Sequence, residues 1–157
     1  MATYAANTEV STERSKAEIE RLLARYGADQ FISGWQESEA VIGFRANGKM
    51  IRFNLPLPRK DEKRFVLSHG GRRTRASDQI LKVWDQTCRQ SWRALALVIK
   101  AKLEAVESEI TSFETEFMAH IVMPDGRTVG DHVRPNIEHA YQSGKVPPLL
   151  PYGPKSA

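Results

Sequence analysis

The sequence predicts one α+β domain, and three patterns along the chain support that prediction. An amphipathic helical repeat comes first, an Asn-Gly hairpin signal follows it, and a much longer helical repeat comes after the hairpin. The chain has 157 residues, close to the usual size of a single domain. We therefore expect an N-terminal helix, an antiparallel β-meander or hairpin, one long amphipathic helix and a short helical C-terminal unit. This domain is expected to cover residues 15–145.

The first helix is predicted from a capping motif and an apolar stripe. Ser15 and Glu18 fit the S-x-x-E capping box, in which each side chain binds a free backbone N–H at the helix start. The apolar residues that follow recur at helical spacing: Ile19, Leu22, Leu23 and Tyr26. Gly27 supplies a left-handed stop. We expect a helix over residues 16–26, and residues 1–14, which are polar and aperiodic, are expected to form a mobile tail.

A β-hairpin is predicted around Asn47-Gly48, the favoured pair for a two-residue type I′ turn. This turn fixes the register of the flanking segments 40–46 and 49–55. The register pairs Ala46 with Lys49, Phe44 with Ile51, Ile42 with Phe53 and Ala40 with Leu55. These pairs form one nearly continuous apolar face, so turn chemistry and alternation agree. A strand at about residues 31–36 is expected to complete a meander.

The remaining chain is predicted to be a basic loop, a long helix and a helical end. Residues 59–75 carry seven Lys or Arg residues and two acids, and we expect a loop there. Apolar residues then recur every three or four positions over 77–110, which predicts a helix about 50 Å long. A second capping box at Thr111 and Glu114 and a cap at Thr128 predict short helices, the last ending before Gly144. Residues 146–157 form a proline-rich tail with an extended path.

The long helix carries a row of cations that suggests nucleic-acid binding. Lys82, Arg89, Arg93 and Lys100 lie within about 20° of one line along the helix axis. A row of this kind is able to follow a phosphate backbone. The expected nucleic-acid-binding residues are those of the row and the preceding loop: Arg72, Arg73, Arg75, Lys82, Arg89, Arg93 and Lys100. The alternative is an ordinary solvated helix face, because Glu104 and Glu107 continue the same line with the opposite charge.

No motif in the sequence indicates catalysis, a cofactor or a metal. Cys88 is the single cysteine and lies on the apolar stripe of the long helix, where we expect a buried, inert thiol. The histidine and acid spacings match no zinc pattern. Trp84 and Trp92 lie on the same stripe and are expected in the core, whereas the place of Trp35 is left open. We also expect no membrane span and no signal peptide, which favours the cytoplasm.

Five segments of the chain have a familiar order when taken together: 17–28, 42–45, 52–58, 92–106 and 123–130. They resemble a family of small uncharacterised proteins encoded by bacteriophages and prophages. The resemblance covers most of the chain after residue 15 and implies no particular active-site residue. It does imply a context, the cytoplasm of an infected bacterium, where DNA replication, recombination and counter-defence are common tasks.

Two functions are compatible with these observations. The first is a non-catalytic accessory protein of phage DNA metabolism or recombination, which binds DNA or RNA through the basic loop and the basic helix face. The net charge of +4 permits an anionic partner of this kind without requiring one. The alternative is a protein-interaction module that binds or inhibits a host or phage protein through the long helix and the proline-rich tail. The length of the helix also suggests a homo-oligomer.

Overall fold

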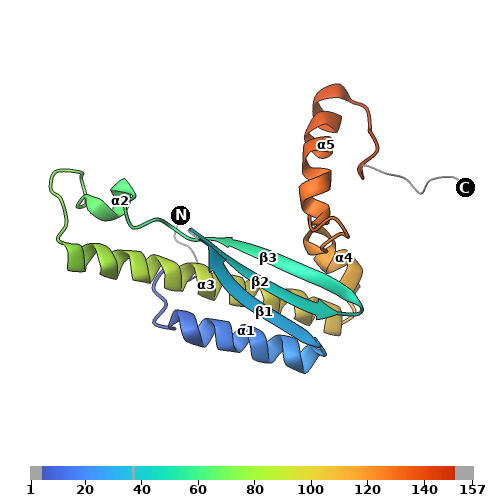
Figure 1. The fold of residues 1–157 in the computed structure, drawn as a ribbon, viewed down its shortest axis with the longest axis horizontal. Coiled ribbons are helices and arrows are strands. Elements are labelled where there is room, and N and C mark those ends of the chain that lie inside the picture. The colour runs from blue at the N-terminus through green and yellow to red at the C-terminus, as the bar shows by residue number, and fades with distance from the viewer. Residues whose placement is uncertain (1–4, 37, 151–157) are drawn as a thin grey trace, which may run out of the picture.

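The computed structural model describes residues 5–36 and 38–150 and confirms the α+β fold class. Figure 1 shows the elements, which are α1 (Thr12–Tyr26), β1 (Gln30–Gln36), β2 (Glu39–Ala46), β3 (Lys49–Pro56), α2 (Lys63–Val66), α3 (Ser77–Glu107), α4 (Phe113–Phe117), the 3₁₀ helix η1 (Met118–His120) and α5 (Val129–Ser143). The three strands form an antiparallel sheet in the order β1-β2-β3. Helices α1 and α3 pack against each other and share one core with the sheet.

The hairpin forms in the predicted register. Asn47 and Gly48 both have positive φ, and Ile42 pairs with Phe53 while Phe44 pairs with Ile51. These four apolar side chains are buried on the sheet face that packs against the helices. Strand β1 adds the expected third strand at the outer edge of β2.

Helix α1 begins earlier than the capping motif predicted. The residue that caps it is Ser11, whose Oγ accepts a hydrogen bond from Arg14 N at 3.2 Å. Ser15 is instead fully buried inside the helix, because its side chain lies on the stripe that packs into the protein. Of the expected tail, residues 1–4 lie outside the described residues. Residues nearby contact α3: Gln86 Nε2 donates to Thr8 O at 2.9 Å, and Gln90 donates to Ala6 O.

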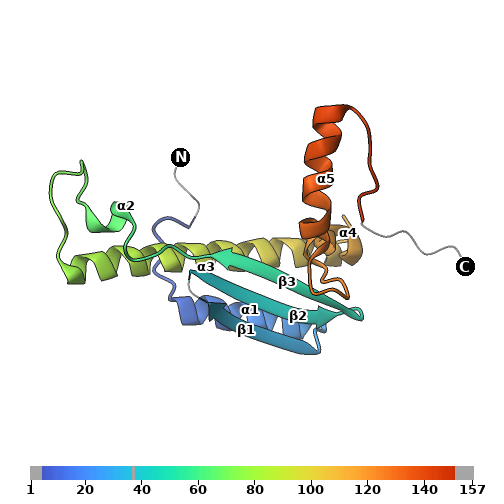
Figure 2. The same cartoon turned by 45° about the horizontal axis from the view of Figure 1, so that its top comes forward.

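The segment between the sheet and α3 is more ordered than the predicted loop. It contains the short helix α2, whose Phe65 is buried, and an isolated bridge between Leu67 and Thr74. The Arg75 guanidinium donates to the carbonyl oxygens of Arg64 and Phe65 at 2.7 and 3.0 Å. The first turns of α3 extend beyond the sheet, with α2 folded back along them (Figures 1 and 2).

The long helix α3 covers most of the predicted range, and the chain itself covers most of its apolar stripe. Trp92, Ile99 and Leu103 join the common core, whereas Leu81 near the N-terminal end stays exposed. The next helix, α4, is capped by Ser112 and not by the predicted Thr111, since Ser112 Oγ accepts from Thr115 N. A homo-oligomer formed through α3 remains a prediction.

The C-terminal unit stands away from the rest of the fold. Helix α5 has the predicted Thr128 cap, contains Pro135 and ends at Gly144 in a left-handed conformation. Figures 1 and 2 both show α5 rising from the end of the fold where α4 lies, and none of its residues is buried. Asn136 binds the carbonyl oxygens of Pro148 and Leu149, so the chain turns back beside the helix. The rest of the proline-rich tail, residues 151–157, lies outside the described residues.

Candidate nucleic-acid interface

The predicted row of cations on α3 is divided by ion pairs. Lys82 and Lys100 are exposed, whereas Arg89 Nε lies 2.8 Å from a carboxylate oxygen of Asp85 on the same helix. The Arg93 guanidinium binds the Glu18 carboxylate of α1, and the Arg93 side chain is only 24% exposed. The place of Arg93 in a solvent-facing row is therefore corrected, whereas the Arg89 side chain is 36% exposed. Arg93 faces a neighbouring helix because α1 packs along this side of α3.

Positive charge is instead concentrated in residues 59–82, a region we call the basic lobe. It includes α2, the segment around it and the first turns of α3. The basic lobe has eight Lys or Arg residues and three Asp or Glu residues, a net charge of +5 against +4 for the whole chain. The rest of the chain therefore carries a net charge of −1. The small positive net charge of the whole chain thus comes entirely from the basic lobe.

Within the basic lobe, some cations have protein partners and others face solvent. Arg59 and Arg64 form ion pairs with Asp61 and Glu62, and Arg75 binds backbone carbonyls. Lys60 is exposed and lies over the Trp84 ring, and four further cations are exposed with neither an ion pair nor a ring contact with the described residues: Lys63, Arg72, Arg73 and Lys82. Asp78 is the one remaining acid of the lobe. Of the seven predicted site residues, the basic lobe thus brings Arg72, Arg73, Arg75 and Lys82 together, and separates them from Arg89, Arg93 and Lys100.

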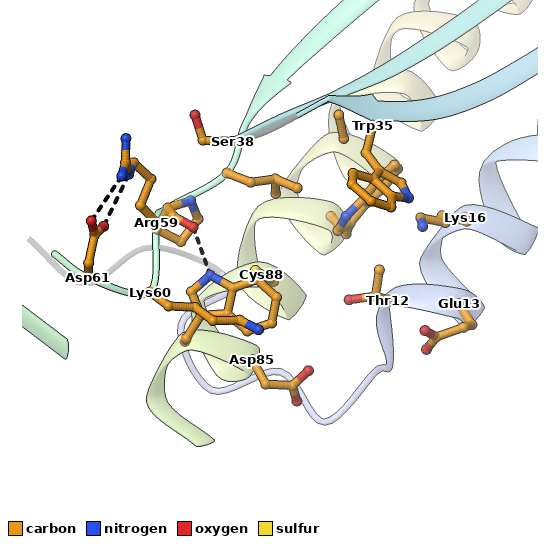
Figure 3. Close-up of a pocket in the computed structure, with 15 residues that line it drawn as sticks. Thr12, Glu13, Lys16, Trp35, Ser38, Arg59, Lys60, Asp61, Asp85 and Cys88 are labelled. Carbon is orange, nitrogen blue, oxygen red and sulfur yellow. Dashed lines mark hydrogen bonds and ion pairs between the residues drawn. The ribbon is translucent and has the colours of Figure 1, made fainter. Parts of the chain in front are cut away.

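A groove of about 930 Å³ adjoins the basic lobe, and we call it the tryptophan groove. Its size falls within the range of small-molecule sites, which is roughly 300–1,000 Å³. Figure 3 shows its walls, which come from the start of α1, the end of β1, the segment after β3 and one face of α3. Residues 59–61 belong to both the lobe and the groove, so the two features are continuous.

The three tryptophans of the groove differ in what already contacts them. Trp92 is buried as predicted, and the Lys16 ammonium lies 4.7 Å from its ring centroid. Trp84 is half-buried, donates from Nε1 to Pro58 O at 2.7 Å, and has the Lys60 ammonium 4.4 Å from its ring centroid. Trp35 is 78% exposed. Trp84 therefore lines a surface groove and does not enter the core, and Trp35 is the most accessible of the three rings.

The formal charges of the side chains that line the tryptophan groove cancel. Its lining includes three cations and three acids: Lys16, Arg59, Lys60, Glu13, Asp61 and Asp85. Asp61 pairs with Arg59, and hydrogen bonding to that guanidinium lowers the pKa of the Asp61 carboxyl. Asp85 pairs with Arg89 just outside the groove. The ammonium groups of Lys16 and Lys60 lie over tryptophan rings, and the Glu13 carboxylate also lines the groove, so the groove is mainly aromatic with two cations and one acid at its edge.

Neither nucleophilic nor metal chemistry is indicated by the described residues. Cys88 is buried as predicted, and burial raises the pKa of its thiol to about 11, with the nearby Asp85 charge adding to the effect. A thiol of this pKa is a poor nucleophile near neutral pH. Among residues 5–36 and 38–150, no three His, Cys, Asp or Glu side chains are grouped to hold a metal ion. The helices of this part of the chain also include none long and apolar enough to cross a membrane.

No family model, curated protein or solved structure matches the chain. The resemblance to phage and prophage proteins therefore remains a prediction from the sequence. The tryptophan groove was not predicted, because Trp35 and Trp84 are far apart in the chain and line one groove only after the chain has folded. One signal was available: alternation from the hairpin register places Trp35 opposite Ala40, on the inward face of the sheet.

Proposed function

We propose that the protein binds nucleic acid without catalysing a reaction, and that the basic lobe makes the phosphate contacts. The observation that carries this proposal is the confinement of a net charge of +5 to residues 59–82. Exposed Lys and Arg side chains bind phosphates and release condensed counterions, whatever the base sequence. Together with the resemblance to phage proteins, this supports an accessory role in phage DNA metabolism or recombination, in the cytoplasm of a bacterial host.

The proposal assigns the contacts to the exposed cations of the lobe. Lys63, Arg72, Arg73 and Lys82 are free to approach a phosphate backbone, whereas Arg93 is held by Glu18. Arg75 is not assigned a phosphate contact. Its guanidinium donates hydrogen bonds to the carbonyl oxygens of Arg64 and Phe65 and so stabilises the fold of the lobe. The sequence-based assignment to the whole α3 row is thereby narrowed to the lobe.

A salt series tests the proposal. We expect the logarithm of the binding constant to fall linearly with the logarithm of salt concentration, with a slope of roughly −0.7 to −0.9 per phosphate contacted. Four contacts predict a slope of about −3 to −4 by this rule. The double variant Arg72→Gln, Arg73→Gln is expected to reduce the slope by up to about two contacts' worth, and to weaken binding to all sequences alike.

A charge-matched control separates the lobe from the net charge. The double variant Arg21→Gln, Arg25→Gln removes the same charge from two exposed positions of α1. We expect it to bind nearly as well as the wild-type protein. Equal losses in both double variants would contradict the assignment to the lobe. Absence of any binding at about 50 mM salt would end the proposal, because nonspecific electrostatic binding is strong at low salt.

A further inference from the structure

The position of Trp35 is unusual for so large an apolar side chain. It pairs in register with Ala40, on the sheet face where Phe31 and Phe44 pair at the end of the strands nearer Asn47-Gly48. On that face Ala40 and Phe44 of β2 are buried, whereas β1 is exposed along most of its length and Trp35 remains 78% exposed at the tryptophan groove. Figure 3 shows its ring beside Lys16 at one end of the groove. Tryptophan is highly buried on average, so the exposed ring is available to a ligand.

The other two tryptophans form fixed walls and are not free to bind. Trp84 is held at its ring nitrogen by Pro58 O, and one side of its ring is occupied by the Lys60 ammonium. Trp92 is buried beneath Lys16. No hydrogen bond from the Trp35 ring nitrogen to another described residue is present, so both its ring and its N–H remain available. A planar ligand therefore finds one accessible aromatic face in a preformed groove.

Continuity with the basic lobe indicates which planar ligand fits. Residues 59–61 connect the exposed cations of the lobe to the groove wall, so a phosphate backbone on the lobe passes the mouth of the groove. Aromatic stacking beside a cationic track is how proteins bind single strands without sequence preference. Bases of a duplex are already stacked on their neighbours, and only an unpaired base is free to enter.

Building on the proposed function, we infer that the preferred ligand is single-stranded nucleic acid, with an unpaired base stacked on Trp35 in the tryptophan groove. The basic lobe holds the adjoining phosphates, and Lys16 and Lys60 provide positive charge at the groove itself. Two of the three acids of the lining, Asp61 and Asp85, are paired with arginines, which leaves Glu13 as the acid of the groove that repels a phosphate backbone.

The test compares strands and variants in one titration. The probes are a single-stranded DNA of about 12 nucleotides, the same sequence as RNA, and the corresponding DNA duplex, a length within the usual range of single-strand sites. We expect the single strands to bind more tightly than the duplex and to quench tryptophan fluorescence. Trp35→Ala is expected to weaken single-strand binding roughly 5- to 100-fold and to remove most of the quenching, whereas Trp35→Phe restores part of the affinity.

Ile32→Ala is the matched control, because Ile32 is also exposed on β1 but lies on the opposite face of the sheet. It should bind like the wild-type protein. Equal binding of single strand and duplex, with no effect of Trp35→Ala, would overturn this inference and leave the proposed function standing. Quenching by a synthetic peptide of residues 146–157, with no quenching by single strands, would also overturn it, since aromatic grooves bind proline-rich segments. Absence of binding to every nucleic acid would refute both.

Discussion

Arg93 of α3 and Glu18 of α1 form an ion pair between the two helices that cover the sheet. Both side chains are half-buried, so the pair is less screened by solvent than a surface contact. This relationship changes the role of Arg93. A residue that helical spacing placed on a solvent-facing row is a structural link between helices, and it is not available to a phosphate backbone.

The variant Arg93→Gln is therefore expected to lower stability and not nucleic-acid affinity. Loss of the charged hydrogen bond leaves Glu18 without its partner at the helix interface, which costs about 1 kcal/mol of unfolding free energy. Urea denaturation measures this loss. Lys100→Gln on the exposed part of the same row is the control and should change stability by less than about 0.5 kcal/mol. Equal stability of the two variants would show that the ion pair contributes nothing measurable.

The thiol of Cys88 is expected to react slowly in the folded protein. With its pKa raised to about 11 by burial, about one thiol in a thousand is ionised at pH 8, and the thiolate is the reactive form. Labelling with a chromogenic disulfide reagent should be slow and become fast and stoichiometric in urea. Rapid labelling under native conditions would show that Cys88 is more accessible than its 5% exposure indicates.

His120 is expected to make stability depend on pH near neutrality. Its ring stacks on Phe53 with centroids 4.0 Å apart, and burial, aided by the Lys102 charge, lowers the pKa of the imidazole below 6.5. The unfolded chain therefore binds this proton more tightly than the folded protein does. The unfolding free energy should fall as pH decreases through about 6.5, and continue to fall until the pH is below the pKa of the folded state.

Urea denaturation at several pH values between about 7.5 and 5.5 measures this dependence, above the range in which carboxylates titrate. His120→Gln should flatten the pH dependence, although it also lowers stability by removing the ring contact with Phe53. His139→Gln, at an exposed position of α5, is the control and should leave the slope unchanged. A slope that persists in His120→Gln would assign the proton uptake to another group.

The hairpin was predictable because two independent constraints selected the same register. Asn47-Gly48 required a two-residue turn, and the alternation of Ile42 and Phe44 fixed which face is buried. Helix starts were less predictable, since both Ser11 and Ser15 are acceptable caps by residue type. Tertiary packing decides between them. Ser15 is buried inside the helix, which therefore begins about one turn earlier, after the Ser11 cap.

The candidate interface was only partly predictable, for a similar reason. Counting charges locates the basic lobe, which is contiguous in sequence and needs no tertiary information. Helical spacing places Arg89 and Arg93 on one line but cannot reveal that Glu18 of another helix faces that line. The tryptophan groove depends on four separate segments and appears only in the folded chain.

The two serines at the start of α1 provide a test with opposite expected signs. Ser11→Ala removes the side-chain acceptor for Arg14 N and should cost about 1 kcal/mol of unfolding free energy. Ser15 Oγ is buried and has no hydrogen-bond partner among the described residues. Ser15→Ala removes this unsatisfied hydroxyl and favours the helix, so it should be neutral or stabilise by up to about 1 kcal/mol. Urea denaturation of the two variants measures both effects, and a loss in Ser15→Ala with none in Ser11→Ala would instead place the cap at Ser15.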